Sequence, residues 1–255
     1  MSLFDKLDDA GDTTPPIIVI YGVDGIGKTT LATEAPNAVY LHTRGENLPS
    51  GLKTPKVRLN DYRDIKDYLE DLLYDDHDFK WVILDALDGM EPLVWEEVCY
   101  EHNKKSMEEF GFGKGYLFAD EFWGEILDLL VRLKEEGIGV IILAHPSIEL
   151  FQSPITEPYN RYTIKIHKRA NALIREAADI VAFMNHRVSV KEVEVTRGKK
   201  VSHAEGKARM IYLTGEAAWD AKNRYSMPDK LEYKKGKGFD ELQSYFPEPT
   251  GKKRR

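Results

Sequence analysis

The chain has 255 residues, of which 42% are hydrophobic, and carries a formal net charge of −7 at pH 7. A chain of this length can bury its own core, and its single cysteine excludes an intramolecular disulfide and favours a reducing compartment. The longest apolar runs, residues 17–21 and 140–144, are too short to cross a bilayer, and the acidic start is unlike a signal peptide. We therefore expect a cytoplasmic protein without a membrane partner.

The charge is divided unevenly along the chain. Residues 1–160 hold 14 Lys and Arg against 31 Asp and Glu, whereas residues 161–255 hold 22 against 12. Such asymmetry indicates a face that binds a polyanion such as a nucleic acid. Two oppositely charged halves that attract each other, within one fold or between subunits, are the alternative interpretation.

The first predicted elements are a short buried strand over residues 17–21 and a helix over residues 29–35, with a glycine-rich loop between them. The loop matches G-x-x-x-x-G-K-[ST], in which backbone N–H groups cradle phosphates, the lysine reaches the β- and γ-phosphates and the hydroxyl binds Mg²⁺. The positive end of the helix dipole favours the same anion. The predicted cofactor-binding residues are Gly22, Val23, Asp24, Gly25, Ile26, Gly27, Lys28, Thr29 and Thr30.

The next elements are a strand over residues 38–41, an amphipathic helix over 61–73 that Asn60 caps, and a strand over 81–84 that ends at Asp85. A carboxylate there lies at the edge of the sheet where open α/β sheets bind ligands. We therefore predict that Thr29 and Asp85 form the Mg²⁺ site. An ordinary strand end is the alternative.

Helices are predicted over residues 91–102 and 117–136, and a strand over 139–144 ends at His145. A neutral histidine at this edge can donate a hydrogen bond to a γ-phosphate and so report its presence, although a histidine without such a role fits the pattern as well. The histidine spacing does not predict zinc. Short apolar strands that alternate with helices predict an α/β fold, with a mostly parallel sheet covered by helices on both faces.

The pattern changes after a predicted helix over residues 167–178. Strands over 180–184, 187–195 and 208–213, the last two joined by a loop over 196–207, predict an antiparallel addition to the sheet. From Ser226 onward the chain is basic and poor in apolar residues, which predicts a mobile tail. Its "GKKRR" end and the "RGKK" stretch are candidate phosphate contacts, or simply solvated charge.

Aromatic and basic residues are interleaved in "PSIELFQSPITEPYNRYTIKIHKRA". Single-stranded nucleic acids are held by stacking on aromatic rings together with phosphate contacts, at roughly 1 to 3 kcal/mol per stacked base. The segment therefore predicts a site for single-stranded DNA with little sequence preference. Packing of these rings on the protein's own core is the alternative.

A resemblance to a known family follows from six stretches in order: "GVDGIGKTT", "VILDALDGMEPLVWEEV", "GFGKGY", "VIILAH", "ITEPYNRY" and "AKNRY". Over residues 15–228 the chain resembles the phage-encoded RecA-like ATPases, a group that includes single-strand annealing proteins, and "KNRY" is similar to the KNRFG motif of RadA. The resemblance implies a RecA-like P-loop NTPase core that binds ATP and Mg²⁺. It also implies a homo-oligomer, a ring or filament with ATP between subunits, and a single-strand-binding or replication protein as a further partner.

The resemblance further implies that residues 104–116 and 146–166 are the two DNA-binding loops. His145 takes the position that senses the γ-phosphate, and Lys222 and Arg224 reach the ATP of a neighbouring subunit. Together with the aromatic and basic pattern, this gives the predicted DNA-binding residues Lys114, Phe151, Tyr159, Arg161, Tyr162, Lys165, Lys168 and Arg169.

One position departs from the family pattern. Relatives place a glutamate that polarises the attacking water just after the second strand, and this chain has Arg44 there. Glu46 is the candidate substitute, and otherwise hydrolysis is expected to be slow. The predicted catalytic residues are Lys28, Glu46, Asp85, His145, Lys222 and Arg224.

The resulting prediction is a flexible N-terminus over residues 1–14, an ATPase domain over 15–225 and a basic tail over 226–255. The predicted function is an ATP-hydrolysing protein that binds single-stranded DNA and anneals or pairs strands in phage recombination or replication. Two alternatives stay open. One is a nucleotide-gated protein-interaction module resembling a helicase loader, and the other is a small-molecule kinase that uses the same phosphate loop.

Overall fold

A nine-stranded sheet forms the centre of the computed structural model, which describes residues 14–187, 189–196, 199–205 and 208–247. The strand order is β13-β11-β8-β1-β5-β4-β2-β3, and β12 pairs with β8 beside this path. The strands are β1 (Ile17–Gly22), β2 (Ala38–His42), β3 (Lys56–Arg58), β4 (Trp81–Asp85), β5 (Gly139–Ala144), β8 (Ile180–His186), β11 (Arg209–Tyr212), β12 (Lys222–Asn223) and β13 (Lys230–Glu232). The pairs from β3 to β8 are parallel, whereas β11, β12 and β13 are antiparallel to their neighbours, so the predicted α/β fold class is confirmed.

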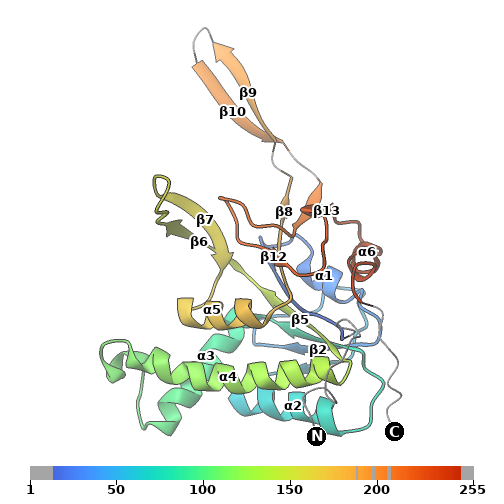
Figure 1. Cartoon of the computed structure of the whole chain (residues 1–255), viewed down its shortest axis with the longest axis vertical. Helices are drawn as coiled ribbons and strands as arrows, with labels where there is room; N and C mark the ends of the chain where they lie inside the picture. Colours follow the sequence, from blue (N-terminus) through green and yellow to red (C-terminus); the bar gives the residue numbers. More distant parts are fainter. Residues whose placement is uncertain (1–13, 188, 197–198, 206–207, 248–255) are drawn as a thin grey trace, which may run out of the picture.

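Helices cover both faces of this sheet (Figure 1). They are α1 (Lys28–Ala32), α2 (Tyr62–Tyr74), α3 (Leu87–Glu101), α4 (Lys114–Glu135), α5 (Lys168–Ala177) and α6 (Gly238–Gln243), with a short 3₁₀ helix, η2 (Met107–Phe110). Strand β1 shows the division, because Val19 and Tyr21 pack with the residues of α2 to α5 while Ile18 and Ile20 pack with those of α1 and α6. All six residues of β1 are buried, as expected for a strand that is covered on both sides.

Several element boundaries differ from those predicted. Asp61, and not Asn60, caps α2, since its carboxylate accepts a 2.9 Å hydrogen bond from the backbone N–H of Asp64. Helix α3 begins at Leu87, directly after β4, because Leu87 and Met90 are buried in the core. Strand β3 was not predicted, since its three residues are largely exposed and show no apolar run.

The prediction of a mobile tail from Ser226 is wrong for residues 226–247. Strand β13 pairs with β11, and α6 packs against α1 and Trp81. A few widely spaced apolar residues achieve this, since Leu231, Phe239 and Leu242 are buried among polar neighbours. Residues 248–255, with the basic "GKKRR" end, lie outside the described residues, as do 1–13 of the predicted flexible N-terminus.

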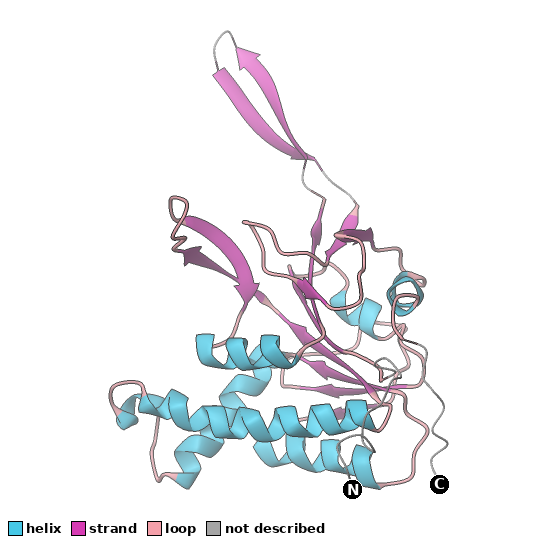
Figure 2. Cartoon of the chain, viewed as in Figure 1, coloured by secondary structure: helices cyan, strands magenta, loops and turns pink. Residues whose placement is uncertain are grey.

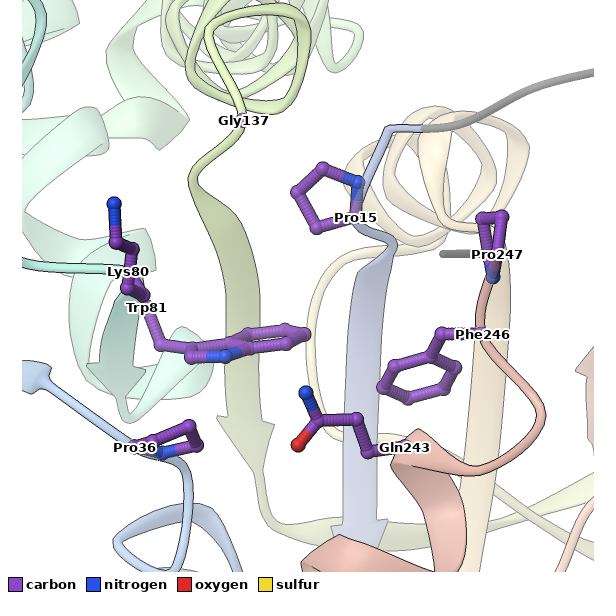
Figure 3. Close-up of a pocket in the computed structure, with 8 residues that line it drawn as sticks. All are labelled: Pro15, Pro36, Lys80, Trp81, Gly137, Gln243, Phe246 and Pro247. Atoms are coloured by element: carbon purple, nitrogen blue, oxygen red, sulfur yellow. The ribbon is translucent and has the colours of Figure 1, made fainter. Parts of the chain in front are cut away.

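The end of this segment closes a small apolar pocket at the amino ends of the central strands (Figure 3). Trp81 at the start of β4 and Phe246 after α6 face it, with ring centroids 6.0 Å apart. Its volume is about 280 Å³, and its lining is completed by Pro15, Pro36, Lys80, Gly137, Gln243 and Pro247. The pocket therefore lies at the amino ends of the strands, whereas the glycine-rich loop lies at their carboxyl ends.

Two β-hairpins extend from the central sheet (Figure 2). Strands β6 (Pro146–Phe151) and β7 (Tyr159–Ile164) form the first, so the predicted DNA-binding loop over 146–166 is largely a hairpin. Strands β9 (Ser189–Thr196) and β10 (Lys199–Glu205) form the second, so part of the segment predicted as a loop over 196–207 is a strand. Residues 197–198 of the "RGKK" stretch lie outside the described residues.

Within the part of the chain that the structure describes, none of the helices combines the length and the apolar character that a membrane span requires.

Candidate nucleotide site

The glycine-rich loop joins the end of β1 to the start of α1, which is the strand, loop and helix order that the motif requires. Gly25 and Gly27 have φ angles of 68° and 107°, a region that side chains with a Cβ rarely adopt. A Cβ on Gly22 would collide with the backbone oxygen of Met184 on the neighbouring β8. The glycines are therefore needed for the shape of the loop and for its close packing on the sheet.

Lys28 is held at the mouth of this loop. Its Nζ donates hydrogen bonds to the backbone oxygens of Gly22, at 2.7 Å, and Val23, at 3.4 Å. Burial lowers the pKa of the ammonium group, and the charges of Asp24 and Asp85 act in the opposite direction. The partly desolvated cation is well placed to bind an anionic phosphate, and the carboxylates close by favour its protonated form.

Asp85 ends β4 with its side chain buried, next to the loop. One carboxylate oxygen, Oδ2, accepts hydrogen bonds from Thr29 Oγ1 at 3.0 Å and from the Tyr40 hydroxyl at 2.8 Å. Burial raises the pKa of Asp85, while the bonds from Tyr40 and Thr29 lower it. The residues fit Mg²⁺, because a hydroxyl and a carboxylate oxygen within hydrogen-bond distance are the hard donors that this ion prefers.

These groups line one cavity of about 420 Å³ at the carboxyl ends of β1, β4 and β5. That volume lies in the range of small-molecule sites, and the position is where open α/β sheets bind ligands. The lining residues are Asp24, Gly25, Gly27, Lys28, Thr29, Thr30, Glu46, Pro49, Asp85 and His145. The structure thus brings together six of the nine predicted loop residues and three predicted catalytic residues beyond the loop, Glu46, Asp85 and His145. Gly22, Val23 and Ile26 are not among the residues that line the cavity.

Glu46 belongs to this cavity although it follows Arg44 in a segment without regular structure. Burial raises the pKa of the Glu46 carboxyl, and the charge of Asp85 raises it further. A raised pKa makes the carboxylate a stronger proton acceptor, as water activation requires. Arg44 is exposed and is not among the residues that line the cavity.

His145 reaches the cavity from the end of β5. Its Nδ1 lies 3.0 Å and 3.1 Å from the two carboxylate oxygens of Asp88, and its backbone N–H donates to the same group at 3.0 Å. The hydrogen bond with Asp88 raises the pKa of His145. Its other nitrogen, Nε2, lies 3.7 Å from Asp24 of the loop. The Asp88 carboxylate therefore orients the ring toward the phosphate loop.

Sequence reasoning missed Asp88, although the second Asp of "DALD" stands three positions after Asp85 at the start of α3. It also missed Arg209 and Tyr233 on the C-terminal strands. The Arg209 guanidinium lies 4.7 Å from the centre of the Tyr233 ring, and its Nη1 is 3.5 Å from the backbone oxygen of Ile26. These contacts brace the loop from a part of the chain that is about 200 residues away.

Lys222 and Arg224 lie at the amino ends of the parallel strands, away from the cavity at their carboxyl ends. Strand β12 pairs with the amino end of β8, and Lys222 Nζ donates to the backbone oxygens of Arg175, Glu176 and Ala178 at the end of α5. Arg224 pairs with the buried Asp179 at 3.2 Å. The structure does not bring these two residues to the chain's own loop, and their action on a neighbouring subunit stays a prediction.

The predicted DNA-binding residues divide into two groups. Phe151, Tyr159 and Arg161 cluster on the β6–β7 hairpin, with 5.4 Å between the two ring centroids and Arg161 5.1 Å from the centre of the Phe151 ring. Lys165, Lys168 and Lys114 are exposed.

Arg161 itself and two further predicted contacts, Tyr162 and Arg169, are engaged within the fold. Arg161 pairs with Asp220 at 3.1 Å, Arg169 pairs with Asp120, and the Tyr162 ring stacks on Phe183 with centroids 5.0 Å apart. These partners lie far away in the sequence, so the pattern of the segment alone could not reveal them. As DNA contacts, Arg161, Tyr162 and Arg169 compete with these internal interactions.

The fold and the site together define a P-loop NTPase: a phosphate loop after β1, an acidic residue after β4 and a polar residue after β5. A family model described as an AAA domain matches residues 14–225, and the chain belongs to this family of P-loop ATPases. No curated protein matches the chain. Among solved structures it is similar to the flagellar accessory protein FlaH from Methanocaldococcus jannaschii, with 11% identity, 88% of this chain and 87% of that chain covered, and a TM-score of 0.43.

Proposed function

We propose that the chain binds ATP with Mg²⁺ in this cavity, hydrolyses it slowly, and uses it to control binding of single-stranded DNA by the β6–β7 hairpin. One observation carries the proposal: the hairpin begins at Pro146, directly after His145, which lines the cavity. A change at the phosphates can therefore reach the hairpin through a single peptide bond. The setting we propose is strand annealing or pairing in phage recombination or replication, in the host cytoplasm and with a single-strand-binding or replication protein as partner.

The hairpin offers a surface that suits a single strand. The Phe151 side chain is 39% exposed beside Tyr159, and Lys165 and Lys168 follow at the exit of the hairpin. Rings stack on bases of any sequence, and lysines contact phosphates. Lys114, at the first position of α4, is a further phosphate contact in the proposal.

In the proposed reaction a water oxygen attacks the γ-phosphorus, and the bond to the bridging oxygen breaks to release ADP and phosphate. Lys28 binds the phosphate oxygens, and Glu46 orients the water and accepts its proton. Thr29 and Asp85 would hold Mg²⁺, which supplies charge neutralisation when bound. Lys222 and Arg224 act on the ATP of a neighbouring subunit, so the active form is a ring or filament. We expect slow turnover because Arg44 stands where relatives have a glutamate.

A second candidate function is a nucleotide-gated protein-interaction module. A specific observation favours it: Ile148, Leu150 and Ile155 of the hairpin are 61%, 62% and 89% exposed. Exposed aliphatic side chains on a projecting element suit a protein partner better than they suit a phosphate backbone.

Fluorescence anisotropy of a labelled single-stranded oligonucleotide tests the proposal, at two salt concentrations and with Mg-ATP, Mg-ADP or no nucleotide. We expect salt-dependent binding that Mg-ATP strengthens and that Lys28→Ala uncouples from nucleotide. The double variant Phe151→Ala/Tyr159→Ala should weaken binding at least tenfold. Tyr245→Ala is the matched control, because this exposed ring lies outside the hairpin.

The outcomes separate the two functions. Absence of DNA binding at low salt in every nucleotide state would contradict the first proposal. A hairpin that responds to nucleotide without binding DNA would instead favour the protein-interaction module. Release of free phosphate, measured on the same samples, tests the hydrolysis step.

A further inference from the structure

Helix α3 carries a buried carboxylate, Glu91, that has no role in the proposed mechanism. Asp88 and Glu91 are three positions apart and therefore lie on the same side of the helix. Glu91 is only 8% exposed, and its Oε1 accepts a 2.7 Å hydrogen bond from the backbone N–H of His167. A buried carboxylate is costly, so the fold must gain from its contact.

The two carboxylates hold the two ends of the β6–β7 hairpin. Asp88 binds both the ring and the backbone N–H of His145, where the chain enters the hairpin. Glu91 binds His167, where the chain leaves the hairpin and begins α5. The two ends are also joined to each other, since the backbone N–H of Lys165 donates to the oxygen of His145 at 3.0 Å.

Helix α3 itself starts two residues after Asp85, so one short segment connects the nucleotide site with both ends of the hairpin. On its other side, β7 is fixed by a hydrogen bond from Tyr162 N–H to the oxygen of Ala218. Arg161 and Tyr162 hold β7 further, through the pair with Asp220 and the stacking on Phe183. The two carboxylates of α3 are the contacts that hold both ends of the hairpin next to the nucleotide site. We propose that Glu91 is a positioning residue that ties the exit of the hairpin to α3, so that the hairpin follows changes at the nucleotide site.

The contact at Glu91 is sensitive to protonation near neutral pH. Burial raises the pKa of Glu91 to about 7, although the hydrogen bond from His167 lowers it and the charge of Asp88 raises it further. An ionised carboxylate accepts a stronger hydrogen bond than a protonated one. Other titratable and charged groups in the segments around it are His145, Lys165, His167, Lys168 and Arg169, together with Asp120 of α4, which pairs with Arg169. Burial and the nearby cations lower the pKa of His167, which favours its neutral form.

The inference rests on the proposed nucleotide binding, and its test follows the hairpin directly. An environment-sensitive dye is attached to Ile155→Cys, at the exposed turn of the hairpin, in a chain that also carries Cys99→Ser. Its signal is recorded with and without a non-hydrolysable Mg-ATP analogue from about pH 6 to pH 8. Binding of a fluorescent nucleotide and thermal unfolding are measured on the same proteins.

In the wild-type background we expect the nucleotide-dependent signal to fall at least twofold as the pH drops below about 7. Glu91→Gln keeps an oxygen that can accept the bond from His167 but cannot titrate. Its signal should therefore exceed that of Glu91→Ala and should lack the part of the pH dependence that Glu91 causes, while the part that His145 causes remains. Glu91→Ala should lose at least half of the signal while it still binds nucleotide. Glu96→Ala, an exposed carboxylate on the same helix, should behave like wild type.

A full signal in folded Glu91→Ala, or a pH profile of Glu91→Gln identical to that of wild type, would overturn the inference. Nucleotide binding without any hairpin signal in the wild-type background would overturn it too, and would leave the proposed nucleotide binding standing. A wild-type chain that binds no nucleotide would overturn both. Rescue by Glu91→Gln separates a positioning role from a loss of folding in Glu91→Ala.

Discussion

Asp85 accepts hydrogen bonds from Thr29 and Tyr40 and is also the proposed ligand of Mg²⁺, and a substitution can separate these two roles. Asp85→Asn keeps an oxygen for Thr29 and Tyr40 but removes the charge that would hold Mg²⁺. We expect the Mg²⁺-dependent gain in nucleotide affinity to fall at least tenfold, about 1.4 kcal/mol, in titrations of a fluorescent nucleotide with and without Mg²⁺. Tyr40→Phe is the comparison: it removes one hydrogen bond to the same oxygen but keeps the charge, so it should cost about 1 kcal/mol of stability and reduce the Mg²⁺ dependence much less than Asp85→Asn.

Glu91 makes a separate prediction for the stability of the fold. Its pKa is about 7 in the folded chain and 4.5 when unperturbed, so between these values the folded state keeps a proton that the unfolded state releases. The contribution of this group to stability is full below about pH 4.5 and is lost as the pH rises through 7, on the order of 3 kcal/mol in total. The difference in unfolding free energy between wild type and Glu91→Gln should follow this slope in urea titrations. A difference that is constant with pH would contradict the assignment.

At the scale of elements, Glu34 attaches the C-terminal segment, residues 230–246, to the rest of the fold. Its carboxylate, just after α1, accepts hydrogen bonds from the Tyr233 hydroxyl and from the backbone N–H groups of Gly236, Gly238 and Phe239. Glu34→Ala should cost about 2 to 3 kcal/mol, because hydrogen bonds to a charged group are strong and their donors would be left unpaired. Hydrogen exchange should rise selectively over residues 230–246. Glu232→Ala, an exposed carboxylate on β13, should change neither quantity.

The same residue shows why part of the fold was predictable and part was not. Strands β1, β4 and β5 and the phosphate loop follow from local patterns, because their apolar runs and glycines need no information about distant residues. The attachment of α6 depends on Glu34, about 200 residues away, and on single buried residues such as Phe239. A basic and polar stretch with so few anchors has the composition of a mobile tail, and only the tertiary contacts distinguish the two.

The residues of the candidate site also divide into those that the sequence predicts and those that only the fold reveals. Lys28, Thr29 and Asp85 were predictable because a short motif fixes their spacing and the sheet fixes their edge. The support that orients His145 was not, since Asp88 comes from a helix and meets it only across the fold. Arg161 and Arg169 show a further limit: their charge predicts DNA contacts, which stay a prediction, and only the fold shows that Asp220 and Asp120 bind them internally.

At the scale of the whole molecule, the placement of Lys222 and Arg224 makes the assembly testable. Both lie at the edge of the sheet opposite the chain's own phosphate loop, so any action on ATP must occur on a neighbouring subunit. Arg224→Ala and Lys28→Ala should each abolish ATP hydrolysis when assayed alone. In an equal mixture, the proposed head-to-tail assembly would bring a site with an intact loop to an intact Arg224 at about one quarter of the interfaces.

Recovery of about a quarter of the wild-type rate in the mixture would therefore support catalysis between subunits, whereas no recovery from proteins that still assemble would contradict it. Arg224 also pairs with the buried Asp179, so its loss affects folding as well. Arg224→Lys is the matched variant, because it keeps a cation for Asp179 but lacks the planar guanidinium that binds two phosphate oxygens at once. If Arg224→Lys folds normally, hydrolyses slowly and is complemented by Lys28→Ala, the defect lies in the contact between subunits and not in the stability of the fold.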